Sequence, residues 1–182
     1  MKLATITGGE RPTLGLVDDE LRVHDLQGVL GDTSLLEVIE RWEDLRPVIA
    51  TTSDLPVVDA PRLHAPIPQP RRNLFAVGKN YREHVREFGR SGYDSPNRSV
   101  ELPTRPVVFS KATTSVTGPF DDIDPHIAVT SELDYEAELA VIIGRGGRGI
   151  SREEALAHVW GYTIINDVTA RDQQLSDGQW TR

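Results

Sequence analysis

The 182-residue sequence contains no cysteine, and this absence excludes several kinds of site. Without thiols the chain can form no disulfide, no zinc–thiolate centre and no cysteine nucleophile. No apolar run reaches the roughly 18 residues that a membrane-spanning helix needs. The N-terminal stretch MKLATITGGERP also lacks the long apolar core of a secretory signal peptide. We therefore expect a cytoplasmic protein that has no membrane partner.

Basic charge is scarce as well. The sequence has 20 lysines and arginines against 28 aspartates and glutamates, which gives a formal net charge of −8. Nucleic-acid binding requires a basic patch, and the basic residues here are dispersed, so we expect no nucleic-acid partner. The length and the 38% hydrophobic composition suit one ordinary domain, or one domain with a small appendage.

A proline-rich segment divides the chain. Residues 56–72, PVVDAPRLHAPIPQPRR, hold five prolines. Proline removes backbone donors and stiffens the chain, so this segment is either a linker or an extended edge segment. We place the domain boundary here. The expected parts are a small N-terminal α+β domain with its linker over 1–68 and a β-rich domain of catalytic type over 69–182.

The N-terminal part predicts a few short elements. KLATI predicts a strand, and LGLVDDELRVHDL predicts two strands joined by an acidic turn around Asp18 and Asp19. SLLEVIERWEDLRPVI has apolar side chains at helical spacing and predicts one helix over 34–49. Ser34 and Glu37 are spaced as a capping box at its start.

The second part alternates strands and helices in this interpretation. LFAVG, VVFS and TIIND predict strands, and NYREHVREFG predicts a helix over 80–89. The polar loop 90–105 is long enough to be a lid. SREEALAHVWGY predicts a helix over 151–162, with Ser151 and Glu154 as its capping box.

A glycine-rich motif leaves two interpretations open. GRGGRG, from Gly144 to Gly149, matches the dinucleotide-binding fingerprint, follows a strand and precedes a predicted helix. Against this, the best helix cap comes after the third glycine, at Ser151, and acids on the preceding strand would repel phosphates. The segment is either part of an NAD(P)-binding domain or a glycine-rich connection.

Acidic side chains mark the most unusual strand, LDYEAELAVIIG. Asp134, Glu136 and Glu138 occupy every second position, so they point to one face, while the second half of the strand is apolar and expected to be buried. Asp167 ends the apolar strand TIIND, where a buried carboxylate needs a proton, a basic partner or a metal. The strand, loop, helix and strand between these positions predict a right-handed crossover that brings Asp167 beside Glu136 and Glu138. Three carboxylates without histidine favour Mg²⁺, with Mn²⁺ or Ca²⁺ as substitutes. The alternative is an edge strand with its acids in solvent.

Four stretches together carry a family resemblance. FAVGKNYREHVREFG, RPVVFSKATTSVTGPFDDI, LDYEAELAVIIG and GYTIINDVTARDQQ resemble the fumarylacetoacetate hydrolase family, in the right order over about residues 73–175. The resemblance implies an α+β protein, with a mostly antiparallel β-rich roll or sandwich behind a small N-terminal domain. It implies a divalent ion bound by Glu136, Glu138 and Asp167, and a homodimer. It also implies that the β-rich domain is incomplete, because members of the family continue with further strands.

The resemblance also implies roles for other side chains. In helix 80–89, His84 has Glu87 three residues later, close enough to orient its imidazole, and the pair is implied to activate water or transfer protons. Lys111 is a candidate for binding a substrate carboxylate, with a surface salt bridge as the alternative. Arg171 and Gln174 are candidates for binding substrate oxygens or a developing oxyanion.

These features predict a Mg²⁺-dependent enzyme acting on small 2-oxo or 1,3-diketo acids. The reaction is C–C bond hydrolysis, decarboxylation or isomerisation through a metal-stabilised enolate, with a step of aromatic catabolism as one setting. Two other interpretations remain open: an NAD(P)-binding domain built on Gly144–Gly149, and a non-catalytic fragment that a metal stabilises.

Overall fold

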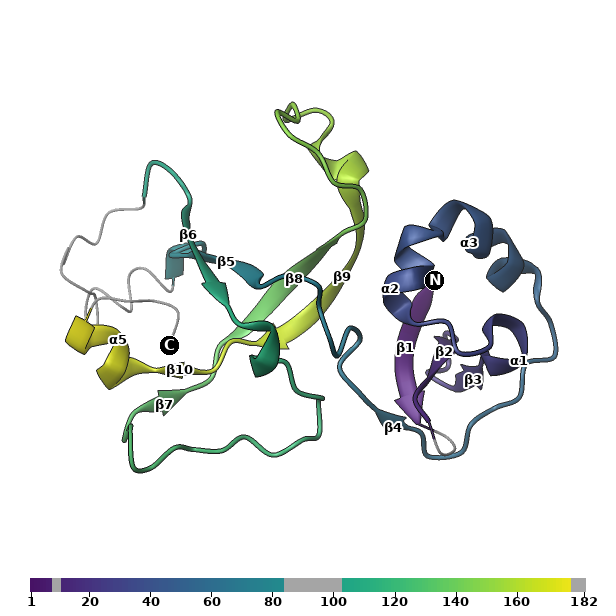
Figure 1. Cartoon of the computed structure of the whole chain (residues 1–182), viewed down its shortest axis with the longest axis horizontal. Helices are drawn as coiled ribbons and strands as arrows, with labels where there is room; N and C mark the ends of the chain where they lie inside the picture. Colours follow the sequence, from purple (N-terminus) through teal and green to yellow (C-terminus); the bar gives the residue numbers. More distant parts are fainter. Residues whose placement is uncertain (8–10, 84–102, 178–182) are drawn as a thin grey trace. The chain divides into compact units, whose positions relative to one another are not determined.

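The computed structural model describes three stretches of the chain, residues 1–7, 11–83 and 103–177 (Figure 1). The chain divides into two compact units, which are described separately. The first consists of Met1–Pro70, Val116–Asp122 and Ile143–Gly161, and the second of Arg71–Ser115, Ile123–Ile142 and Tyr162–Arg182. The domain boundary expected near residue 68 stays a prediction.

The first unit contains an antiparallel four-stranded sheet in the order β3-β2-β1-β4. Its strands are β1 (Lys2–Thr7), β2 (Thr13–Val17), β3 (Val23–Asp25) and β4 (Arg62–Leu63). β4 lies within the proline-rich segment and pairs with β1 at one edge of the sheet, which is where proline-bearing strands are tolerated. This part of the segment is therefore an extended edge strand.

Three short helices accompany this sheet: α1 (Gln27–Leu30), α2 (Leu35–Glu40) and α3 (Trp42–Thr51). The capping box of Ser34 and Glu37 is present at the start of α2. The single helix predicted over 34–49 is wrong, because Arg41 leaves helical geometry (φ −107°, ψ 27°) and separates α2 from α3. The break still lets both helices bury their apolar stripes. The core of this unit contains Ile6, Leu26, Leu35, Val38, Ile39, Leu45 and Ile49.

The second unit is built from short antiparallel strands. β5 (Leu74–Gly78) pairs with β6 (Val107–Lys111), as the LFAVG and VVFS patterns predict. β7 (Leu133–Asp134) pairs with β10 (Thr169–Ala170), and α5 (Arg171–Asp177) follows β10 directly. Most of the predicted helix 80–89 and of the predicted lid 90–105 lies outside the described residues.

β8 (Ala137–Ile143) and β9 (Val159–Asn166) form a two-stranded ribbon, along which the chain runs out and returns (Figure 1). The amide of Gly144 donates to the carbonyl of His158 at one end (3.0 Å), and the amide of Asp167 donates to the carbonyl of Glu136 at the other (2.8 Å). The strands therefore run in opposite directions, and the predicted right-handed crossover is wrong.

The connection between these strands holds a 3₁₀ helix, η2 (Ala155–His158), and no α-helix over 151–162. Ser151 does accept a hydrogen bond from the amide of Glu154 (3.3 Å), but this pattern closes only a turn. The following residues, VWGYTIIN, are β-branched and aromatic, and they favour a strand. Gly144–Gly149 therefore leads into a turn, whereas the dinucleotide fingerprint needs an α-helix that begins within the motif.

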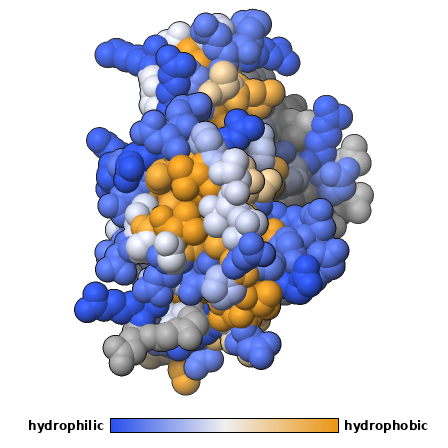
Figure 2. All heavy atoms as spheres, turned by 90° about the vertical axis from the view of Figure 1, so that its right-hand side faces the viewer, coloured by the Kyte–Doolittle hydropathy of each residue, from blue (hydrophilic) through white to orange (hydrophobic). Residues whose placement is uncertain are grey.

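The ribbon does not bury its apolar half. Leu139, Val141 and Ile143 of β8 are exposed, and so are Tyr162 and Ile164 of β9, which contradicts the expectation that the second half of LDYEAELAVIIG is buried. Figure 2 shows another face of the molecule, on which hydrophobic side chains gather in patches between hydrophilic ones. Among the described helices, none has the length and apolar character that crossing a membrane requires.

Candidate active site

The acidic side chains share a face even though their strand is interrupted. Asp134 ends β7, Glu136 lies in the break, and Glu138 is the second residue of β8. The alternation of exposure continues through the break: these three side chains are partly covered, whereas Tyr135 and Ala137 between them are exposed. The two-residue period therefore predicts the common face correctly.

The ribbon brings Asp167 next to this face. Besides the hydrogen bond between the Asp167 amide and the Glu136 carbonyl, the amide of Glu136 donates to the side-chain oxygen of Asn166 (3.0 Å). Asp167 is 7% exposed, and its Oδ1 lies 2.8 Å from Nζ of Lys111 in β6. Lys111 Nζ also donates to the carbonyl of Val168 (3.3 Å). Lys111 is thus paired inside the acidic group and is not part of a surface salt bridge.

Glu138 carries the least compensated charge of this group. Among the residues that the structure describes, it has no hydrogen-bond or ion-pair partner. Burial raises the pKa of Glu138 above its ordinary value, and the negative charges of Asp167 and Glu136 raise it further, while Lys111 acts in the opposite direction. A cation placed beside Glu138 would relieve this repulsion.

Arg171, the first residue of α5, is 7% exposed and holds several groups of the site together. Its Nε and Nη2 both donate to Oδ2 of Asp134 (2.9 and 2.8 Å), and Nη2 lies 3.0 Å from Oε1 of Glu136. Its Nη1 donates to Oε1 of Gln174 (3.1 Å), which is also buried. The guanidinium is therefore engaged with protein oxygens here, and substrate binding by Arg171 and Gln174 stays a prediction.

Two polar residues next to Asp167 were missed by the sequence analysis. Thr169 is 2% exposed, and its hydroxyl donates to Oε1 of Glu136 (2.9 Å). Asn166 holds the backbone of Glu136, as described above. Their position could have identified them in the sequence, because both lie within two residues of Asp167 at the end of an apolar strand.

The donor set suits a hard cation in its chemistry, since Glu136, Glu138 and Asp167 offer only carboxylate oxygens. Burial first, and then the charges of Asp167 and Glu136, raise the pKa of Glu138, so a nearby cation would favour its ionised form. Within the described residues, however, no three histidine, aspartate or glutamate side chains are arranged so that they could hold a metal ion. Binding of one ion by these three residues together therefore stays a prediction.

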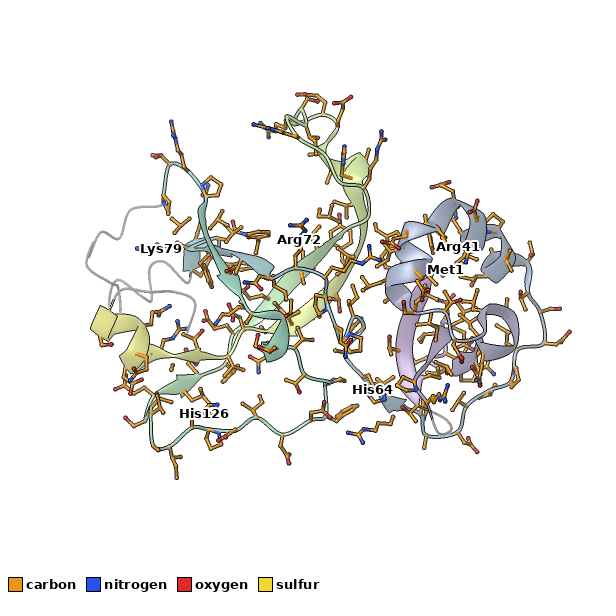
Figure 3. The ribbon with its side chains drawn as sticks, in the orientation of Figure 1. Met1, Arg41, His64, Arg72, Lys79 and His126 are labelled. Carbon is orange, nitrogen blue, oxygen red and sulfur yellow. The ribbon has the colours of Figure 1, made fainter. Side chains whose placement is uncertain are left out.

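The predicted catalytic pair, His84 and Glu87, lies outside the described residues. The four described histidines each contact a partner that does not belong to the acidic group. The pairs are His24 with Asp18, His64 with Thr7, His126 with Asp124, and His158 with the carbonyl of Arg145. Figure 3 shows His64 beside β4 and His126 on the segment that leads to β7. His84 remains the histidine to test.

The antiparallel β-rich unit and its acidic group define a protein of the class that the four sequence motifs resemble. The family model for the fumarylacetoacetate (FAA) hydrolase C-terminal domain matches residues 73–182, which is more than half of the chain. The chain belongs to the fumarylacetoacetate hydrolase family.

Individual relatives agree with this assignment. The chain is 38% identical over 194 residues to oxaloacetate tautomerase YisK of Bacillus subtilis, an alignment that covers 96% of this chain and 62% of the relative. The structure is similar to fumarylacetoacetate hydrolase from Exiguobacterium antarcticum, with a TM-score of 0.76, 39% identity, and coverage of 100% of this chain and 61% of that one. It is also similar to maleylpyruvate hydrolase from Sphingobium sp. SYK-6 in complex with manganese(II) and pyruvate, with a TM-score of 0.72, 25% identity, and coverage of 100% and 63%.

These relatives are enzymes, and they are longer than this chain, which spans 61–63% of their lengths. Their names describe different reactions on small molecules. The family is therefore shown, while the reaction of this protein is a separate question.

Proposed function

We propose that this protein is a divalent-metal-dependent enzyme that acts on a small 2-oxo or 1,3-diketo acid. The observation that carries the proposal is the grouping of Glu138, Glu136 and Asp167 beside Lys111, with Glu138 lacking a hydrogen-bond or ion-pair partner among the described residues. Support for a metal also comes from the maleylpyruvate hydrolase whose structure contains manganese(II) and pyruvate. Mg²⁺ is the ion we propose, with Mn²⁺ or Ca²⁺ as substitutes.

Glu136, Glu138 and Asp167 would hold the cation. When bound, the ion would act as a Lewis acid on the oxygens of the substrate and would offset the negative charge of the three carboxylates. The charge of Asp167 is already balanced by Lys111 in this structure. Glu138 is therefore the carboxylate whose negative charge a bound cation would offset, because no lysine or arginine side chain forms an ion pair with it among the described residues.

Lys111 and Arg171 supply the positive charge for an acidic substrate. Lys111 presents an ammonium group next to the three carboxylates, held by Asp167 and by the carbonyl of Val168. We propose that it binds the substrate carboxylate. Arg171 and Gln174 are proposed to bind a second substrate oxygen, which requires Arg171 to share donors with Asp134.

Proton transfer is assigned to His84, oriented by Glu87. Oxo acids with a hydrogen on the carbon next to the carbonyl exchange between keto and enol forms when a base removes that proton and returns it elsewhere. Isomerisation of this kind is the first reaction to test, because a tautomerase is among the relatives. Hydrolysis of a C–C bond and decarboxylation are the other proposed outcomes, and a homodimer in the cytoplasm is the proposed setting.

The test uses the full-length protein and oxaloacetate, with keto–enol conversion followed by ultraviolet absorbance. We expect activity with Mg²⁺ or Mn²⁺, loss of activity in EDTA, and recovery when the metal is returned. Glu138→Gln should reduce kcat/KM by more than about 100-fold, since even residues that only support a metal ligand cost 10–100-fold. Glu153→Gln, an exposed acid in the other unit, is the matched control.

Two results would separate the parts of the proposal. Full activity after exhaustive metal removal would overturn the metal requirement. Metal binding without any turnover of oxaloacetate would contradict the choice of oxaloacetate as substrate, and other oxo acids would then be tested.

A further inference from the structure

We propose that Thr169 is a positioning residue, whose hydroxyl restrains the carboxylate of Glu136, one of the proposed cation ligands. This inference rests on the proposed function and adds a role for a residue that touches neither the substrate nor the reacting atoms. Thr169 lies in β10, which pairs with β7, and it is 2% exposed. Its Oγ1 donates to Oε1 of Glu136 across 2.9 Å.

The hydroxyl has one proton and two neighbouring acceptors. The carbonyl of Asp167 lies 3.2 Å from Thr169 Oγ1, which is a longer contact than that to Glu136. A hydrogen bond to an ionised acceptor is shorter and stronger than one to a neutral carbonyl. The proton therefore goes to Glu136, and the shorter distance agrees with this.

Glu136 is held at the same oxygen by a second donor. Nη2 of Arg171 lies 3.0 Å from Oε1, and Asp134 fixes the guanidinium through two hydrogen bonds to one oxygen. Thr169 and Arg171 are two positions apart, so their side chains reach the carboxylate from the same segment. Two donors on one oxygen restrict the side-chain torsions of Glu136 more than a single ion pair does.

The backbone of Glu136 is anchored without Thr169. Its amide donates to Asn166, and its carbonyl accepts from the amide of Asp167. Removing the hydroxyl of Thr169 should therefore loosen the carboxylate, which keeps its contact with Arg171, while the backbone stays in place. Groups that support metal ligands in this way typically change metal affinity by 10–100-fold.

The experiment measures Mn²⁺ binding to the full-length protein, with the electron paramagnetic resonance signal of unbound Mn²⁺ as the readout and no substrate present. Thr169→Val keeps the shape of the side chain and removes the donor. Thr169→Ser and Thr169→Ala form a second pair that differ only in the hydroxyl. Thr163→Val, at a partly covered threonine of β9, is the control for a β-branched replacement in another strand of the chain.

We expect Thr169→Val and Thr169→Ala to weaken Mn²⁺ binding by about tenfold or more, and Thr169→Ser and Thr163→Val to bind as the wild type does. Melting temperatures in EDTA are measured beside the affinities. A purely structural role would lower the melting temperature of Thr169→Val and Thr169→Ala and leave the Mn²⁺ affinity unchanged, which would overturn the inference. Equal weakening in Thr169→Ser and Thr169→Ala would also overturn it.

The wild-type protein distinguishes this inference from the proposed function. If the wild type binds no Mn²⁺, the proposed metal site fails and the inference fails with it. If the wild type binds Mn²⁺ and both donor-free variants bind equally well, only the role of Thr169 fails. Should Thr169→Val not fold, the comparison of Thr169→Ser with Thr169→Ala decides.

Discussion

Charge balance at single residues explains how an acidic group persists inside the second unit. Asp167 is deeply buried and has the ammonium of Lys111 at 2.8 Å, and Glu136 has the guanidinium of Arg171 at 3.0 Å. Glu138 has no such partner among the described residues, and its pKa is raised. A buried carboxylate is tolerated when a cation lies close by, so removal of either cation leaves a costly charge.

Lys111→Met tests this balance. The side chains of Lys111 and Asp167 are 15% and 7% exposed, so the replacement leaves a buried carboxylate without its partner. We expect the free energy of unfolding to fall by about 3 kcal/mol at neutral pH in EDTA, as for other broken buried pairs. Saturating Mn²⁺ should reduce this loss, because a bound cation compensates the same carboxylate. Urea unfolding provides the measurement.

The control is Lys2→Met. Lys2 and Asp19 are 3.5 Å apart, with side chains 55% and 100% exposed, and such surface pairs contribute about 0–1 kcal/mol. Equal losses for Lys111→Met and Lys2→Met would show that burial of the Lys111–Asp167 pair has no energetic consequence.

His24 in the first unit supplies a pH-dependent contribution to stability. Its Nε2 lies 2.9 Å from Oδ2 of Asp18, and its Nδ1 lies 3.3 Å from the carbonyl of Leu55. The hydrogen bond to Asp18 raises the pKa of His24 above its ordinary value of 6.5, and the carbonyl of Leu55 adds to this. Because the folded state favours the protonated ring, the stabilisation is complete below pH 6.5 and is lost as the pH rises through the raised pKa.

We therefore expect His24→Gln to destabilise the protein most at acidic pH, with a difference from the wild type that shrinks above neutrality. Unfolding free energies across this range measure it, and a nuclear magnetic resonance titration of the ring gives the pKa directly. Asp18→Asn should return the pKa of His24 toward 6.5. A difference between His24→Gln and wild type that does not vary with pH would contradict the assignment.

At the scale of elements, local patterns predict strand faces well and connections poorly. The two-residue period places Asp134, Glu136 and Glu138 on one face, and this survives the break at Tyr135. The spacing of Ser151 and Glu154 predicts a helix that does not form, because a capping pattern reports only on one turn. Whether a strand returns directly or through a crossover depends on pairing with distant residues, which no short window contains.

For the candidate site as well, short sequence patterns identify conspicuous residues but not the contacts that depend on the pairing of distant segments. Sequence patterns single out the three carboxylates and Lys111, since charged residues beside apolar strands are conspicuous. They do not reveal that Arg171 contacts Asp134, or that Thr169 contacts Glu136, because these contacts depend on the pairing of β7 with β10. The pairing joins Asp134 to Thr169 and Leu133 to Ala170, which are far apart in the sequence, and threonine is an ordinary residue in any strand.

The glycine motif gives an element-scale prediction. A Cβ on Gly144 would lie 2.7 Å from Cβ of Trp160, Gly149 has a φ of +65°, and a Cβ on Gly146 would meet nothing within 4 Å. We expect Gly144→Ala to cost about 2 kcal/mol through overpacking and Gly149→Ala about 1 kcal/mol through backbone strain. Gly146→Ala should be close to neutral, and urea unfolding of the three variants measures these effects.

The ranking of these three stability losses, with Gly146→Ala the smallest, is the ranking expected if the glycines form a packed turn. In the dinucleotide fingerprint, the second glycine lets the backbone approach a pyrophosphate, and this glycine would be Gly146. NADH or NADPH binding that Gly146→Ala abolishes, with stability unchanged, would contradict the assignment of these glycines to a turn.

At the scale of the whole molecule, the second unit leaves apolar strand faces open to solvent. In β5 and β6, Phe75, Val77 and Val108 are exposed, and Leu139 and Ile164 are 60% and 78% exposed in β8 and β9. Contiguous apolar faces of this kind mark interaction surfaces, or sites of association when nothing covers them. The net charge of −8 opposes association only through long-range repulsion, which salt screens.

We therefore expect a protein consisting of residues 1–182 to associate through these faces and to bind a hydrophobic dye, more strongly at high salt. The double variant Leu139→Thr and Ile164→Thr keeps residues that favour strands and removes the apolar contact, so it should shift sedimentation toward the monomer. Val57→Thr, which removes apolar surface from a side chain that is 54% exposed in the first unit, is the matched control. A wild type that remains monomeric over the whole concentration and salt series would show that these faces do not drive association, and a dimer that the double variant leaves intact would place the contact elsewhere.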